Sequence, residues 1–123
     1  MSLRPQAAFL TLASPHIENL VQFYQQLFDQ KPEPYIPHKF AEFQLAGMRL
    51  AIFKPKAANQ AEFASATSGR LSLCLEVDDL EQAIAHLQTL GHPATDEIMA
   101  ASHGREIYAY DPDGNRLILH QSH

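Results

Sequence analysis

A repeated order of predicted elements is the feature that most constrains the fold of this chain. In the first half, a small apolar strand at 7–13 precedes an amphipathic helix at 17–28, whose apolar residues recur at three- and one-residue steps. Two alternating strands, 40–46 and 48–53, follow and meet at Gly47. This half therefore has the pattern of a strand, a helix and a hairpin.

The second half repeats the pattern. An apolar strand is predicted at 71–77, a helix at 79–90, and paired strands at 105–110 and 116–121 on either side of the turn Asp-Pro-Asp-Gly-Asn. A weaker strand is expected near Ile98. Each half is then a β-α-β-β-β module.

Local signals place the helix ends. Ser14 followed by Pro15 predicts an N-cap and a first helical residue, and Asp78 with Glu81 resembles a capping box. The Pro-Glu-Pro stretch at 32–34 is expected to end the first helix, and Gly91 followed by Pro93 the second.

Length and pattern together predict one α+β domain. The 123 residues suit one domain and are too few for two. We place the first module at about 5–56 and the second at about 68–123, joined by a polar, Ala-rich linker at 54–69.

Composition excludes several partners. The net charge of −5 and the lack of a basic run argue against nucleic acid. No apolar stretch is long enough to span a bilayer, and no charged-then-apolar leader is seen. The single Cys74 fits a reducing cytosol, and its apolar strand pattern predicts a packed thiol rather than a nucleophile. We therefore expect a cytoplasmic protein with no nucleic-acid or membrane partner.

Four passages carry a family resemblance. They are 14–24 ending in Phe-Tyr, the hairpin at 43–53, Leu-Glu-Val-Asp-Asp-Leu at 75–80, and Asp-Pro-Asp-Gly-Asn at 111–115. In this order and spacing they resemble the vicinal oxygen chelate superfamily of glyoxalase I, bleomycin-resistance proteins and extradiol dioxygenases. The resemblance implies a curved mixed sheet around a cleft, helices on its outer face, and a homodimer.

Metal-dependent members of that family bind a divalent ion with His, Gln or Glu at four strand positions. Counting along the motifs places these positions on Phe9, Ala51, Ser72 and Ile118. None is a usual ligand, since such ions favour imidazole or carboxylate. The seven His residues show no i, i+4 pair and are expected in loops or on the surface. We therefore expect no metal and no cofactor.

Alternation along the strands assigns side chains to two faces. One face is apolar, through Leu and Phe residues, and should pack under the helices. The other face mixes aromatic and polar groups, as small-molecule sites do. The candidate ligand-binding residues on it are Phe9, Thr11, Arg49, Ala51, Ser72, Glu106, Tyr108, Ile118 and His120.

Two interpretations of this face remain open. An Arg in a cleft suits a carboxylate or phosphate, so Arg49 and Tyr108 are expected near an anionic or acceptor group of the ligand. Alternatively, the face is solvated, and Arg49 pairs with Glu42 across the hairpin.

Three functions follow from these interpretations. The first is metal-independent binding of an unknown small organic ligand. The second is a lyase, isomerase or dioxygenase, either metal-dependent or using acid–base groups such as Glu76, Glu106, Tyr108 and His120. The third is an interaction role as a dimer with a vestigial cleft.

Overall fold

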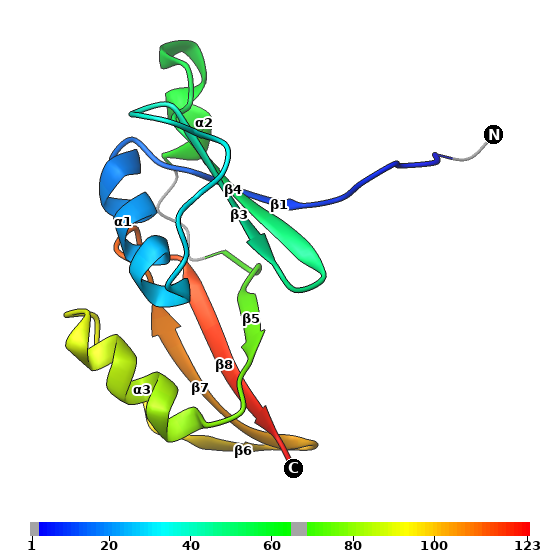
Figure 1. The fold of residues 1–123 in the computed structure, drawn as a ribbon, viewed down its shortest axis with the longest axis vertical. Helices are drawn as coiled ribbons and strands as arrows, with labels where there is room; N and C mark the ends of the chain where they lie inside the picture. The colour runs from blue at the N-terminus through cyan, green and yellow to red at the C-terminus, as the bar shows by residue number, and fades with distance from the viewer. Residues whose placement is uncertain (1–2, 65–68) are drawn as a thin grey trace. The chain divides into compact units, whose positions relative to one another are not determined.

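The computed structural model describes residues 3–64 and 69–123. The chain divides into two compact units, Met1–Ser65 and Ala66–His123. Each unit contains one four-stranded mixed sheet and a long helix against it, in the order β-α-β-β-β (Figure 1). The α+β class and the repeated module predicted from the sequence are therefore confirmed. Within the described residues, no helix is long and apolar enough to cross a membrane.

The sheet of the first unit has the strand order β1-β4-β3-β2. Strand β1 (Leu10–Ala13) runs parallel to β4 (Met48–Phe53), which forms an antiparallel hairpin with β3 (Phe40–Leu45). The hairpin turns at Gly47, whose φ of +83° suits a residue without a Cβ. Strand β1 is shorter than the predicted 7–13, while the hairpin lies where the alternation placed it.

Helix α1 (Ile17–Phe28) has the predicted bounds and covers one face of this sheet (Figure 1). Its apolar stripe is buried, and Tyr24 packs against the fully buried Phe43 of β3, with ring centroids 6.4 Å apart. Phe28 also contacts Phe43, at 6.0 Å, and stacks on Tyr24 at 5.6 Å. This aromatic cluster fixes the helix on the sheet.

The start of α1 differs from the prediction. His16 is the N-cap residue and Ile17 begins the helix, two residues later than Ser14 and Pro15 suggested. The Ser14 hydroxyl does accept a hydrogen bond, but from the backbone N–H of His16 at 3.1 Å, inside the turn before the helix. The helix ends at Asp29 in the left-handed conformation, with φ 48°, before the Pro-Glu-Pro stretch is reached.

Two short parts of this unit were not predicted. Strand β2 (Tyr35–Ile36) pairs with β3 and is held to α1 by a hydrogen bond from the Tyr35 hydroxyl to Glu18, at 2.7 Å. The predicted linker contains a 3₁₀ turn, η1 (Ala57–Asn59), and the short helix α2 (Gln60–Phe63). Residues 65–68 of that linker lie outside the described residues.

The sheet of the second unit has the equivalent order β5-β8-β7-β6. Strand β5 (Leu73–Glu76) is parallel to β8 (Arg116–Ser122), which is antiparallel to β7 (Gly104–Tyr110). The weak strand expected near Ile98 is β6 (Met99–Ala101). Its pairing with β7 completes the module.

Helix α3 (Leu80–Thr89) has Asp79 as its N-cap, in place of the predicted Asp78. The Asp79 carboxylate accepts a hydrogen bond from the Gln82 backbone N–H at 3.0 Å. A side-chain acceptor at this position satisfies an N–H that has no partner within the helix. The cap is therefore an Asp, as predicted, but one residue later, and the Glu81 carboxylate binds Arg105 and does not complete a capping box.

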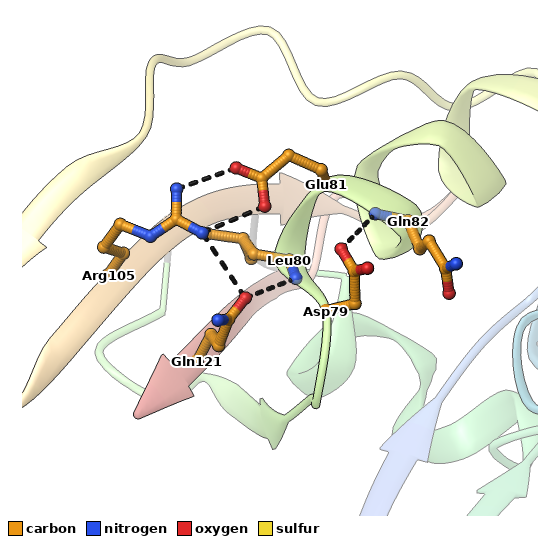
Figure 2. A network of polar contacts seen from close by, with 6 residues as sticks. All are labelled: Asp79, Leu80, Glu81, Gln82, Arg105 and Gln121. Atoms are coloured by element: carbon orange, nitrogen blue, oxygen red, sulfur yellow. Dashed lines mark hydrogen bonds and ion pairs between the residues drawn. The ribbon is translucent and has the colours of Figure 1, made fainter. Parts of the chain in front are cut away.

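A polar network ties the first turn of α3 to the sheet (Figure 2). Arg105 of β7 donates two parallel hydrogen bonds to the Glu81 carboxylate, at 2.8 and 2.9 Å, and the Gln121 side chain of β8 accepts from the Leu80 N–H at 2.7 Å. Arg105 and Gln121 therefore point toward the helix. Because neighbouring strand residues alternate, the even-numbered residues of β7 and β8 point the other way.

Candidate functional site

Each sheet has one face under its helix and one turned away, which we call the polar face. Leu50, Ile52, Leu117 and Leu119 lie on the helix faces, with at most 2% of their surface exposed, as predicted. Leu71 is an exception, since it precedes β5 and is 79% exposed. The polar faces carry two sets of side chains. In the first unit these are Phe9, Thr11, Glu42, Gln44, Arg49 and Ala51; in the second, Ser72, Cys74, Glu76, Glu106, Tyr108, Arg116, Ile118 and His120.

Arg49 is the centre of the polar face of the first unit. Its Nη1 lies 3.3 Å from Oε1 of Glu42, and its guanidinium carbon lies 4.3 Å from the centre of the Phe9 ring. The same Glu42 oxygen accepts from the Gln44 side chain at 2.9 Å, and Glu42 is only 8% exposed. The cross-hairpin pair considered from the sequence is therefore present, and it neutralises the Arg49 charge.

Two more predicted residues share this face. Thr11 of β1 is the register partner of Ala51 of β4, and Ala51 is also the partner of Glu42 on β3. Thr11 is exposed, whereas Ala51 is fully buried. Ala51 is thus enclosed between its neighbours on this face, while the Thr11 hydroxyl is accessible.

Arg116 lies at one end of the polar face of the second unit. Its Nε donates to the Ser72 hydroxyl at 2.6 Å and its Nη2 to the Gly69 carbonyl at 2.9 Å. Its guanidinium carbon lies 5.9 Å from the centre of the Tyr108 ring. Ile118 is the register partner of Tyr108 and lies beside it on the sheet. Three predicted residues, Ser72, Tyr108 and Ile118, are therefore brought together around this Arg.

His120 lies at the other end of that face. Its side chain is 8% exposed, and Nδ1 lies 2.7 Å from Oε1 of Glu76. The other Glu76 oxygen, Oε2, accepts from the Ser122 N–H at 2.8 Å. Nε2 is buried next to Gly104 and has no hydrogen-bond partner among the described residues. The expectation of surface or loop histidines is therefore wrong for His120, because Gly104 leaves room for the ring. Glu106 is its register partner.

Hydrogen bonds make the carboxyl group of Glu76 more acidic than usual. The hydrogen bond with His120, followed by those from Ser122, lowers the pKa of Glu76 from 4.5 to about 2. The carboxylate is therefore ionised at neutral pH and accepts from the protonated Nδ1 of His120. The remaining nitrogen, Nε2, then carries only a lone pair in the neutral ring.

Stability should depend on this carboxylate in acid. A lowered folded-state pKa contributes stability above the unfolded value near 4.5, and this contribution is lost as the pH falls toward 2. Urea denaturation from pH 6 to pH 2 should therefore show a smaller decline for Glu76→Gln than for the parent protein. Glu62→Gln, which alters an exposed carboxylate of α2, is the control and should decline like the parent. Equal slopes for all three proteins would contradict the assigned contacts.

Cys74 differs from the prediction of a packed thiol. Its side chain is exposed on the polar face, next to Ile118 in register. Partial burial, with the nearby carboxylates of Glu106 and Glu76, raises the pKa of its thiol. The thiol therefore stays protonated at neutral pH and is a poor nucleophile, as expected.

The four positions at which metal-dependent relatives hold an ion do not fit one here. Phe9, Ala51 and Ile118 offer no lone pair, and the Ser72 hydroxyl is already bound to Arg116. Across residues 3–64 and 69–123, no group of three or more His, Cys, Asp or Glu side chains is placed to hold a metal ion. We derive no chemistry through a metal at these positions.

Comparison with known proteins identifies the family. Residues 6–119 match the Glyoxalase/Bleomycin resistance protein/Dioxygenase superfamily. The chain belongs to this superfamily. The match spans both units, so the resemblance inferred from the four sequence passages is confirmed. No curated protein matches the chain.

Several solved structures share the fold at low sequence identity. A glyoxalase/bleomycin resistance protein/dioxygenase from Nocardioides is 22% identical, with a TM-score of 0.74 and coverage of 99% of this chain and 86% of that one. The fosfomycin resistance protein FosX from Listeria monocytogenes is 18% identical, with a TM-score of 0.74 and coverage of 98% and 96%. A lactoylglutathione lyase from Agrobacterium tumefaciens is 18% identical, with a TM-score of 0.72 and coverage of 96% and 95%. These similarities establish the fold of this superfamily member and leave its activity to be argued from its own residues.

The predicted ligand-binding set omitted Arg116 and Glu76, although alternation places both on the polar face. Glu76 had been considered only as a possible acid–base group. The strand register contains a signal for Arg116. Glu42 lies diagonally across the hairpin from Arg49, whereas Arg116 has the uncharged Tyr110 directly opposite and the uncharged Tyr108 diagonally opposite on β7. A comparison of the residues opposite each Arg in the two predicted hairpins would have distinguished Arg49, which has a nearby carboxylate, from Arg116, whose β7 neighbours are uncharged.

Proposed function

We propose that this protein binds a small organic ligand on the polar faces of its sheets and does so without a metal ion. The observation that carries the proposal is the ordered set of polar and aromatic side chains on these faces. Arg116 is held by two hydrogen bonds beside Tyr108, and Arg49 is held between Glu42 and Phe9. A merely solvated face has no need of such fixed groups, whereas a ligand site gains from having them in place before binding.

The donor chemistry supports the metal-free form of this proposal. Binding requires a shaped surface with a few placed polar groups, so it is unaffected by Phe, Ala and Ile at three of the four ligand positions. The only oxygen in that set, on Ser72, serves instead to orient Arg116. The Ser72 hydroxyl therefore contacts a cationic side chain of the protein, the Arg116 guanidinium.

The enzyme alternative meets an obstacle at His120. An imidazole oriented by a carboxylate, as His120 is by Glu76, is the usual arrangement of a general base. The nitrogen that would accept the proton, Nε2, is covered beside Gly104. A general base must reach the proton that it removes. The pair therefore favours a structural role, and we do not propose it as a catalytic base.

A thermal-shift screen tests the proposal. Organic acids and related metabolites are added to the protein with EDTA, and separately with zinc or nickel. We expect at least one compound to raise the melting temperature equally in all three conditions. A ligand at one hundred times its Kd stabilises the folded state by about 2.7 kcal/mol. A response that appears only with added metal, or no response to any compound, would contradict metal-free binding. The homodimer and the cytoplasmic location expected from the sequence stay predictions.

A further inference from the structure

Arg116 is fixed in position on the polar face of the second unit. The hydrogen bonds to Ser72 and Gly69 use Nε and Nη2, and the plane of the guanidinium lies near the Tyr108 ring. The residue is half-buried. Holding the side chain in one conformation removes much of the entropy that a ligand would otherwise have to offset on binding.

Among the described residues, the Arg116 charge differs from the other fixed cations in having no carboxylate counterion. Arg49 pairs with Glu42, and Arg105 of the same unit pairs with Glu81 at 2.8 Å. No carboxylate in the described part of the second unit forms an ion pair with Arg116, and both of its hydrogen-bond partners are neutral oxygens. A partly desolvated guanidinium without a counterion is a favourable place for a carboxylate or phosphoryl group.

The polar face of the second unit is electrically asymmetric along β8. Arg116 and His120 are four residues apart, so their Cα atoms are separated by about 13 Å. Glu76 and Glu106 lie on either side of His120 in register. Ile118 lies midway, between Tyr108 and Cys74. The face therefore has a cationic end, a largely apolar middle and an acidic end.

We propose that Arg116 anchors a carboxylate or phosphoryl group of the ligand, whose body lies over Ile118. The acidic end, formed by Glu76 and Glu106, then favours a cationic or hydrogen-bond-donating group on the ligand. This inference rests on the proposed function. It also specifies which end of the ligand is anionic and how the ligand is oriented along the sheet. It assigns the anion to Arg116 instead of Arg49, because an anion at Arg49 would compete with Glu42.

Three probes of similar shape and different charge test the inference. Backbone amide shifts of the full chain are followed by NMR during titration with benzoate, benzamide and benzylamine. Benzoate should perturb Ser72, Tyr108 and Arg116, benzylamine should perturb the acidic end, and benzamide should bind about tenfold more weakly than benzoate. Arg116→Gln should weaken benzoate binding about tenfold, equivalent to about 1.4 kcal/mol, without affecting benzylamine. Arg105→Gln is the matched control, since it removes a cation of the same unit that pairs with Glu81 at α3, and it should leave benzoate binding unchanged.

The outcomes separate the two claims. If benzoate binds Arg116→Gln as tightly as the parent protein and still perturbs the polar face, Arg116 is not the anchor and the proposed function stands. If none of the probes perturbs either polar face, both claims fail. Arg116→Lys keeps the charge but loses the planar guanidinium, so this variant replaces Arg116→Gln in the experiment if the Gln variant does not fold. Benzoate should then bind this variant more weakly than the parent, and unchanged affinity would contradict a role for the guanidinium.

Discussion

Phe43→Ala is expected to lower the free energy of unfolding by about 3–5 kcal/mol. Phe43 is fully buried, and its ring packs against both Tyr24 and Phe28 of α1, at 6.4 and 6.0 Å. Removing the ring leaves a cavity that the helix and β3 can fill only in part. Urea denaturation followed by circular dichroism measures the loss.

Phe9→Ala is the control for this prediction. Phe9 precedes β1 on the opposite side of the same sheet and is 46% exposed, so its main contact is the Arg49 guanidinium. The expected loss is at most about 1 kcal/mol. Similar losses for the two variants would mean that the helix face and the polar face have been assigned the wrong way round.

Gly104→Ala is expected to lower the free energy of unfolding by about 3 kcal/mol, at the upper end of the usual cost of overpacking. A Cβ added at Gly104 would clash with the backbone carbonyl of Gln121 and lie 2.9 Å from Nε2 of His120. Since the first obstacle is backbone, β8 itself must shift. The same change should displace His120 and alter its ring resonances in the NMR spectrum.

Gly69→Ala provides the matched control. The nearest heavy atom to its added Cβ is the backbone nitrogen of Leu71 at 3.7 Å, an ordinary contact. Its effect on stability should be within about 0.5 kcal/mol. If Gly104→Ala is equally harmless, β7 and β8 do not approach each other as described, and the burial of His120 needs another explanation.

Periodicity predicted the main elements because burial follows the repeat of each structure. The α1 stripe and the hairpin at Gly47 both appear as expected. The predicted helix starts were wrong by one or two residues. Neighbouring polar residues can each serve as the N-cap, and the conformation of the preceding turn determines which of them does so. Strand β2 was not predicted because two residues are too few to show an alternating pattern. It is held by tertiary contacts such as the hydrogen bond from Tyr35 to Glu18.

The candidate site was predictable to the level of the sheet face and no further. Alternation placed Arg49, Tyr108 and His120 on the polar faces. The predicted hairpin also suggested the Arg49–Glu42 pair, but the contacts of Arg116 and His120 were not predicted. The hydrogen bond from Arg116 to Gly69 joins residues 47 positions apart. The enclosure of His120 depends likewise on Gly104 from another strand. Such contacts arise from the tertiary register and leave no local pattern in the sequence.

Mapping a bound ligand in the presence of EDTA tests the central claim most directly. The compound that most stabilises the protein in the thermal-shift screen is titrated into labelled protein, and the perturbed amides are assigned. We predict perturbations at the polar-face residues 72–76, 106–108 and 116–120, with the same Kd with and without EDTA. Loss of binding in EDTA, or perturbations confined to α1 and α3, would contradict metal-free binding on the polar face.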